Sequence, residues 1–234
     1  MNMIQGLSIM DVFAPLWFIF CWAGYSVFAD LDSRHRTSLV GVTSEYRLNW
    51  MRQMLKRDNR MMDATLIGNL LRSISFFAST TIFIILAIFT LLKYREEASG
   101  ILINIPYVTP STPLLWEVKV FTLIAIFIYA FFKYTWSLRL YNYSCVIVGA
   151  APLSTERDEH FEEYAQNSSK VIINAGKHFN RALRANYFGL AAFSWFLNDW
   201  LFIAMSTLVV GVLYRREFRS LALKYMMNAS AFRS

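Results

Sequence analysis

The 234-residue sequence has few of the residues that build catalytic, redox or metal sites. It contains 2 Cys and 3 His, none of them at the spacing of a CxxC or HExxH motif. Cys21 and Cys145 lie far apart in apolar surroundings, so neither a disulfide framework nor a zinc site is indicated. Walker A and GxSxG motifs are also absent. We therefore expect no catalytic residue, no metal site and no cofactor, and we predict that the protein is not an enzyme.

Charged residues are also scarce, whereas apolar residues come in long runs. Asp, Glu, Lys and Arg make up 17% of the chain and apolar residues 56%, while a soluble domain has about 25% charged residues. Residues 13–29, 74–92 and 120–132 contain no charged side chain. About 20 helical residues cross a hydrocarbon layer roughly 30 Å thick. The sequence predicts an all-α polytopic transmembrane helical bundle, and a soluble protein with buried core helices is the disfavoured alternative.

Three membrane spans follow from these runs, at about residues 10–29, 66–92 and 114–136. The first ten residues contain no Lys or Arg, and the apolar run after them is longer than that of a signal peptide. We therefore expect this run to remain as the first span. Pro106, Pro110 and Pro113 mark the segment before the third span as a loop.

The number of further spans depends on residues 188–213, a 26-residue apolar stretch with Asn198 and Asp199 in its middle. A turn at residues 198–200 would place 20 of the 23 Lys and Arg residues on one side of the membrane, as cytoplasmic segments prefer. An Asp in mid-bilayer would cost at least ~2.5 kcal/mol. We favour two spans, 178–197 and 200–214, and hence about five membrane helices, or four if 188–213 crosses once.

The whole chain, residues 1–234, is then a single membrane domain with its N-terminus outside and its C-terminus in the cytoplasm. The cytoplasmic segments are at about 30–65, 140–177 and 215–234. Each of the first two is expected to form an amphipathic helix, the first capped by Thr43 or Ser44 and the second by Ser154 or Thr155.

The first of these helices carries two kinds of side chain. Leu48, Met51, Met54 and Leu55 recur at helical spacing, and cations fill much of the rest, at Arg47, Arg52, Lys56 and Arg57. A basic amphipathic helix of this kind can lie along an anionic leaflet. Its apolar stripe can equally pack on the bundle or on a partner, and the sequence leaves both open.

Polar residues at membrane depth are functional candidates by default. Small or polar residues share one stripe of the second span, which suits either close helix contact or a polar path. Cations beside aromatic residues end the third span, as at a headgroup interface. The candidates for lipid contact or a polar path are Asn69, Arg72, Ser75, Ser79, Lys133 and Arg139.

Several long segments resemble one known family. They are RLNWMRQMLKRDNRMMDATLIGNLLRSISFFASTTIF, FFKYTWSLRLYNYSCVIVGAAP, HFNRALRANYFGLAAFSW and VLYRREFRS. Over about residues 34–220 the chain is similar to the bacterial integral membrane proteins called domain of unknown function 599. The resemblance implies a multi-pass protein of the bacterial inner membrane and supplies neither a reaction nor catalytic residues.

Three functional hypotheses remain. The first is a non-enzymatic accessory, scaffolding or self-associating subunit, in a homo-oligomer or larger membrane complex, that contacts anionic lipid headgroups through a basic inner face. The alternative is a channel or transporter with a polar path along the second span. The weaker alternative is an enzyme that modifies a lipid or quinone and holds the headgroup with Arg72, Lys133 and Arg139. Because the cations follow the membrane ends, nucleic acid is not an expected partner.

Reagents that cannot cross the membrane test the predicted topology. The thiol of Val40→Cys and a tag after Ser234 should both be protected in intact cells and react after permeabilisation, because both follow cation-rich segments. Val108→Cys, between the second and third spans, is the control and should react in intact cells. A tag that reacts from outside while residue 40 stays protected would contradict the turn at residues 198–200.

Overall fold

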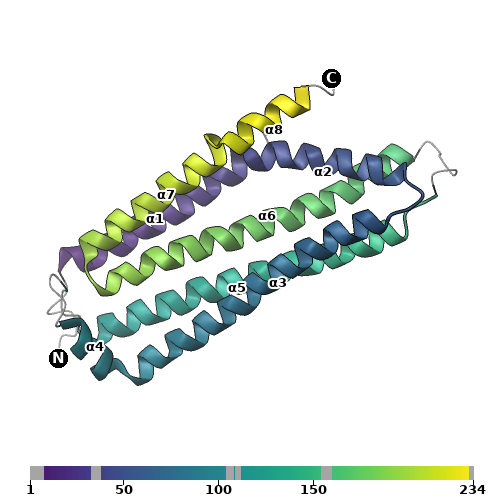
Figure 1. Ribbon diagram of the computed structural model, residues 1–234. Helices are drawn as coiled ribbons and strands as arrows, with labels where there is room; N and C mark the ends of the chain where they lie inside the picture. The colour runs from purple at the N-terminus through teal and green to yellow at the C-terminus, as the bar shows by residue number, and fades with distance from the viewer. Residues whose placement is uncertain (1–7, 33–37, 104–107, 109–111, 154–159, 232–234) are drawn as a thin grey trace. The chain divides into compact units, whose positions relative to one another are not determined.

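A computed structural model describes residues 8–32, 38–103, 108, 112–153 and 160–231. Every regular element in these residues is helical, which confirms the predicted all-α class (Figure 1). The α-helices are α1 Ile9–Asp32, α2 Leu39–Leu55, α3 Met61–Lys93, α4 Arg95–Ile103, α5 Pro113–Gly149, α6 Phe161–Phe193, α7 Asp199–Phe218 and α8 Leu221–Ala231. A short 3-10 helix, η1, covers Ser194–Phe196.

Three of the described helices are long and apolar enough to span a membrane. They are α1 over Ile9–Leu31, α3 and α5. The apolar 18-residue segments of these helices, here called apolar windows, have mean hydropathies of 1.7, 2.3 and 1.9 in that order. The last two exceed the predicted spans, since α3 has 33 residues and α5 has 37. At about 1.5 Å per residue each is roughly 50 Å long or more, well beyond the roughly 30 Å of a hydrocarbon core.

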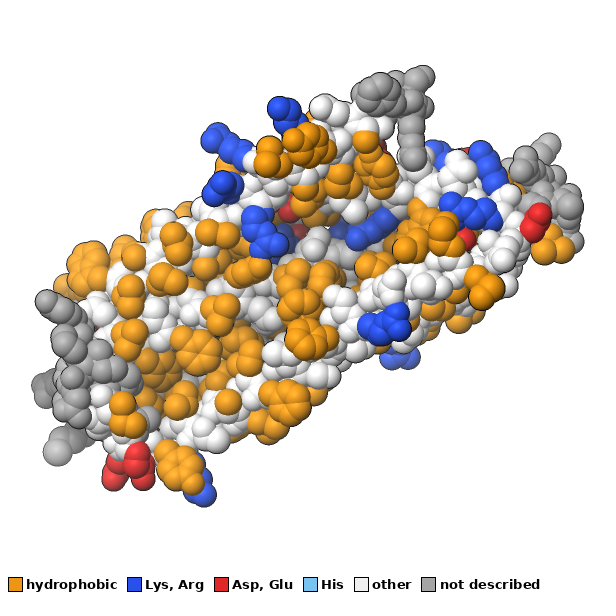
Figure 2. Space-filling view, viewed as in Figure 1, with side chains coloured by type: hydrophobic (Ala, Val, Ile, Leu, Met, Phe, Trp, Pro, Cys, Tyr) orange, Lys and Arg blue, Asp and Glu red, His pale blue; other side chains and the backbone are white. Residues whose placement is uncertain are grey.

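Most side chains in the apolar parts of α1 and α3, and half of those in α5, are not buried. In the apolar windows only 28% of α1, 22% of α3 and 50% of α5 is buried. Phe20, Phe83 and Phe121 are 68%, 70% and 56% exposed, and Figure 2 shows hydrophobic side chains across much of the visible surface. A soluble monomer rarely exposes an apolar surface of this extent, whereas lipid tails accept it.

The chain breaks its helix between α6 and α7. The amide of Trp200 donates to Asn198 Oδ1 over 2.8 Å, and Trp195 Nε1 donates to Asp199 Oδ1 over 3.0 Å. Residues 188–213 are therefore two helices, with the break next to the predicted turn. Whether each crosses the membrane stays a prediction, because α7 has only about 15 residues without charge between Asp199 and Arg215, roughly 22 Å of helix.

Contacts divide the chain into two compact units. Unit 1 consists of Met1–Leu31, Thr80–Ala130 and Leu183–Arg215. Unit 2 consists of Asp32–Ser79, Phe131–Ala182 and Arg216–Ser234. Helices α3, α5 and α6 contribute residues to both units. The predicted single membrane domain stays a prediction.

Aromatic side chains form the core of unit 1. Phe18 of α1 lies 5.8 Å from the ring centroid of Phe188 in α6 and 5.1 Å from that of Phe202 in α7. Trp195 stacks on Phe202 at 5.0 Å. All four residues are at most 2% exposed. Each of these aromatic side chains buries a large apolar area against its neighbours. The cluster therefore holds α1 and α7 side by side with α6 (Figure 1).

The apolar stripe of α2 packs inside unit 2. Met51, Met54 and Leu55 are 0% exposed, so of the two readings of this helix, packing on the bundle is the one observed. The prediction of the N-cap was wrong, because Ser38 accepts the hydrogen bond of Gly41 N at 3.1 Å.

The two residues predicted as caps lie within the first turns of α2. Thr43 and Ser44 donate their hydroxyls back to the carbonyls of Leu39 and Val40. Ser154 and Thr155, the caps predicted for the second cytoplasmic helix, lie outside the described residues.

Two glycines in the helices of unit 1 offer a matched test of close packing. A Cβ at Gly189 in α6 would lie 2.7 Å from the ring of Phe127, whereas nothing lies within 4 Å of one at Gly211 in α7. Alanine in a helix interior is normally favoured over glycine by about 0.5–1 kcal/mol. We expect Gly211→Ala to leave the Tm in detergent unchanged or higher. Gly189→Ala should lower stability by about 1–3 kcal/mol, and equal shifts would contradict the close contact.

Candidate functional site

The two units differ strongly in charge. Unit 2 contains 18 of the 23 Lys and Arg residues and 10 of the 16 Asp and Glu residues, a net charge of +8. Unit 1 contains the other 5 cations and 6 anions, a net charge of −1, and the two values give the +7 of the whole chain. On the face shown in Figure 2, most of the Lys and Arg side chains lie on helices of unit 2.

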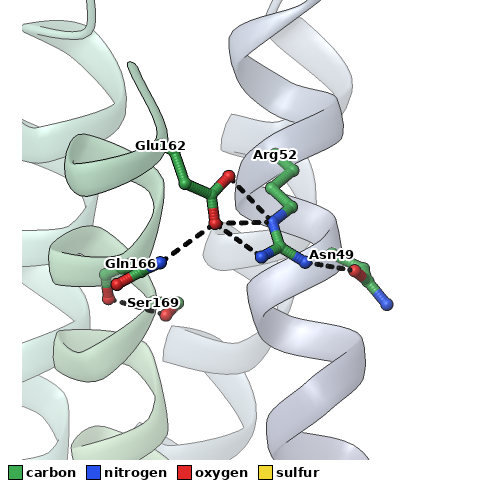
Figure 3. Close-up of polar contacts among 5 residues, drawn as sticks. All are labelled: Asn49, Arg52, Glu162, Gln166 and Ser169. Carbon is green, nitrogen blue, oxygen red and sulfur yellow. Dashed lines mark hydrogen bonds and ion pairs between the residues drawn. The ribbon is translucent and has the colours of Figure 1, made fainter. Parts of the chain in front are cut away.

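One of these cations forms an ion pair between two helices. Arg52 of α2 forms an ion pair with Glu162 of α6, with Nη2 2.5 Å from Oε1 and Nε 3.1 Å from each carboxylate oxygen. Asn49 and Gln166 extend the network on either side (Figure 3). The hydrogen bond from Arg52 lowers the pKa of Glu162, and the same bond raises the pKa of Arg52.

A second group stabilises the connection from α2 to α3. Asp63, in the first turn of α3, is 0% exposed. Its Oδ1 atom accepts hydrogen bonds from Trp50 Nε1 and from Arg57 Nη1, both at 2.7 Å. A buried carboxylate needs such partners, since an uncompensated buried charge is strongly unfavourable.

Two more arginines contact backbone. Arg60 donates to the carbonyls of Ala151 and Pro152, just after the end of α5, where a helix presents unpaired carbonyls. The guanidinium of Arg47 lies directly against Gly176 of α6, so that a Cβ at position 176 would collide with it. Of the four cations that one of the two readings placed along a leaflet, Arg47, Arg52 and Arg57 therefore form contacts within unit 2.

The predicted polar stripe lies on the outward side of α3. Asn69, Arg72, Ser75 and Ser79 are exposed, while the buried residues Ile67, Ile74 and Ala78 form a separate stripe of the same helix. Arg72 donates to the side chain of Asn69, one turn earlier on the same helix. These side chains therefore do not line an interior of unit 2, and their role as lipid or path residues stays a prediction.

The other two predicted residues lie on α5. Lys133 is half-buried and Arg139 is exposed. Arg139 Nε donates to the hydroxyl of Tyr143 over 2.8 Å, and its guanidinium lies 5.9 Å from the centre of that ring. Nearby, Trp136 contacts His178 of α6 at 6.3 Å. This mixture of cations and amphipathic aromatic rings is typical of a membrane–water interface.

A buried lysine in unit 1 was not among the predicted site residues. Lys119 of α5 is 3% exposed, and its Nζ donates to the carbonyl of Trp195 over 2.8 Å and lies 5.4 Å from the ring centroid. Asp199 and Asp11 attract it electrostatically. In the sequence, Lys119 stands out only as a lone cation at the start of an apolar run. Its hydrogen-bond partner is a backbone carbonyl, and because every residue has one, the sequence does not identify this partner.

Comparison with known proteins identifies one family. The chain matches the family described as "Protein of unknown function, DUF599" over residues 13–222. The chain belongs to this family. The match covers nearly the whole chain and confirms the resemblance found in the sequence. No curated protein and no solved structure matches the chain.

The ion pair between Arg52 and Glu162 should make a pH-dependent contribution to stability. Since the pKa of Glu162 is lowered below its ordinary value of 4.5, the contribution is fully present above that value and is lost as pH falls through the lowered pKa. Both side chains are about half exposed, at 40% and 52%, so we expect a coupling below about 1 kcal/mol.

A double-mutant cycle with Arg52→Gln and Glu162→Gln, read as Tm in detergent at several pH values, measures this coupling. The control is Lys170→Gln, which removes a cation of α6 that, among the described residues, donates only to Asn167 on the same helix. The control should shift Tm equally at all pH values. A coupling that persists unchanged below the lowered pKa would contradict the assignment.

Proposed function

We propose that the protein is a non-enzymatic membrane subunit that contacts anionic phospholipid headgroups through the cations of unit 2. The observation that supports this proposal is the charge division, +8 in unit 2 against −1 in unit 1. Near an anionic leaflet each Lys or Arg contributes about 1 kcal/mol of attraction. The proposal includes the bacterial inner membrane as location, with the N-terminus outside and the C-terminus in the cytoplasm.

The contacts between helices should hold the helices of unit 2 in fixed positions, and with them the exposed cations that make no contact between helices. Arg47, Arg52, Arg57 and Arg60 are engaged within unit 2, so they fix the positions of α2, α3, α5 and α6. Exposed cations such as Arg72 and Arg139 then project from helices whose side chains are ordered by packing. A rigid scaffold of this kind loses less conformational entropy on binding than a mobile basic tail.

The exposed stripe of α3 supports the self-association part of the proposal. Gly68 has nothing within 4 Å of the position where a Cβ would stand, and Ser75 and Ser79 are exposed next to it on the same side of the helix. Small residues let two membrane helices approach closely, and polar side chains can form hydrogen bonds across such a contact. We therefore assign the small residues of this face to contact with a second copy or with another subunit of a larger membrane complex, and the long side chain of Arg72 on the same face to a headgroup beside that contact.

The lipid part of the proposal is tested with the full chain in nanodiscs of phosphatidylglycerol or phosphatidylcholine. The double variant Arg72→Gln/Arg139→Gln should lower the relative affinity for phosphatidylglycerol roughly tenfold to thirtyfold, as expected for the loss of two exposed cations. Native mass spectrometry of the retained lipids gives this ratio together with the subunit number.

Arg52→Gln is the matched control, because it removes a cation that is engaged with Glu162. It should lower Tm in both lipids and leave the lipid ratio unchanged. A wild-type chain that retains the two lipids equally would refute the lipid assignment. Ion flux through liposomes that Arg72→Gln alters would instead support the channel hypothesis.

A further inference from the structure

Unit 1 contains a hollow with a volume of about 510 Å³ between the end of α3, the start of α4 and the start of α5. Ligand pockets generally measure about 300–1,000 Å³. The hollow is lined by three apolar residues, Leu92, Trp116 and Phe121, here called the apolar wall, and by charged residues of both signs, here called the charged wall. Apolar and charged side chains around one hollow can contact both parts of an amphiphile.

The apolar wall has a buried and an exposed part. Trp116 is 4% exposed, donates its Nε1 to the carbonyl of Leu91 over 3.4 Å and contacts Phe196 at 4.9 Å. Phe121 lies further along α5 and is 56% exposed. Tryptophan is enriched at the level of the headgroups, so the ring of Trp116 suits the region between a headgroup and its acyl chains.

The charged wall carries two cations, Lys93 and Arg95, and three carboxylates, Glu96, Glu97 and Glu117, a net charge of −1. The side chains of Arg95, Glu97 and Glu117 make no hydrogen bond or ion pair with any other residue in the part of the chain that the structure describes. Arg95 is nevertheless partly buried. A partly buried guanidinium without a partner is a natural site for an anionic group.

Helix stability does not account for the position of Arg95. It is the first residue of α4, where the helix dipole favours negative charge. Glu96 and Glu97 in the same turn follow this preference, and Arg95 opposes it. The helix dipole therefore does not favour Arg95 at this position, where it lines the hollow.

From these features we infer that the hollow binds a phospholipid whose headgroup joins a phosphodiester to a primary ammonium. The phosphate lies against Arg95 and Lys93, and the ammonium donates to the carboxylates of Glu97 and Glu117. The glycerol and the first carbons of the acyl chains lie against Leu92, Trp116 and Phe121. This site belongs to unit 1 and is independent of the lipid contacts proposed for unit 2.

The charge of the wall sets the order of preference among lipids. An ethanolamine headgroup places an N–H donor opposite each carboxylate and a phosphate opposite the cations. A choline headgroup has the same charges but no N–H donor. A glycerol headgroup is anionic and meets a wall of net charge −1. We expect phosphatidylethanolamine to bind most tightly, then phosphatidylcholine, then phosphatidylglycerol.

The experiment is a titration of the purified full chain in mild detergent with these three lipids, matched in acyl chains, followed by native mass spectrometry. Arg95→Gln and Glu117→Gln should each weaken binding of phosphatidylethanolamine about tenfold, the loss of one charge-assisted hydrogen bond. Glu117→Lys changes the wall from −1 to +1 and should reverse the preference in favour of phosphatidylglycerol. Tm without added lipid verifies that each variant is folded.

Arg215→Gln is the control, since Arg215 is an exposed cation of unit 1 that does not line the hollow. It should leave binding of phosphatidylethanolamine unchanged. Soluble glycerophosphoethanolamine carries the same headgroup without acyl chains and should compete only weakly. Equal competition would overturn the assignment to a lipid. Equal binding of the three lipids, or no effect of Arg95→Gln and Glu117→Gln, would overturn the site itself.

Discussion

The constraint on which the rest of this structure depends is the cost of charge in hydrocarbon. A helix satisfies its own backbone hydrogen bonds inside a bilayer, but each Lys, Arg or Asp at the centre of a span costs at least about 2.5 kcal/mol. The residues 13–29 and 74–92 are uncharged for this reason. The chain then has to place its 39 charged residues elsewhere, 23 of them cations and 16 anions. Their unequal division between units 1 and 2 follows from where the uncharged runs lie.

Arginine performs two tasks in unit 2. Arg52 and Arg57 neutralise carboxylates of other helices, and Arg60 binds carbonyls at the end of α5. The planar guanidinium suits both tasks, because its several donors have fixed directions. Net positive charge alone would predict repulsion among the helices. The ion pairs and carbonyl contacts offset that repulsion and leave a smaller set of cations at the surface.

The sequence predicted the features that depend on composition along one helix. Uncharged length identified α1, α3 and α5, and the polar pair Asn198 and Asp199 identified the break before α7. The cap of α2 was misplaced because Ser38, Thr43 and Ser44 are chemically alike, and the apolar periodicity becomes visible only from Leu48 onward.

Features that depend on several helices at once could not be read from the sequence. Helical spacing groups Asn69, Arg72, Ser75 and Ser79 on one stripe, but it does not say whether another helix covers that stripe. The same limit applies to Lys119, whose partner is the carbonyl of Trp195, 76 residues away. The hollow beside α4 requires the ends of three helices and has no signature in any one of them.

The contact between Arg47 and Gly176 has an evolutionary consequence. A side chain at position 176 would occupy the volume of the guanidinium, so the end of the Arg47 side chain has to move when residue 176 gains a Cβ. A methyl group at 176 would turn the guanidinium away from α6 and so remove this contact between the two helices. Family members that keep the contact should therefore carry glycine at this position of α6 together with the large cation on α2.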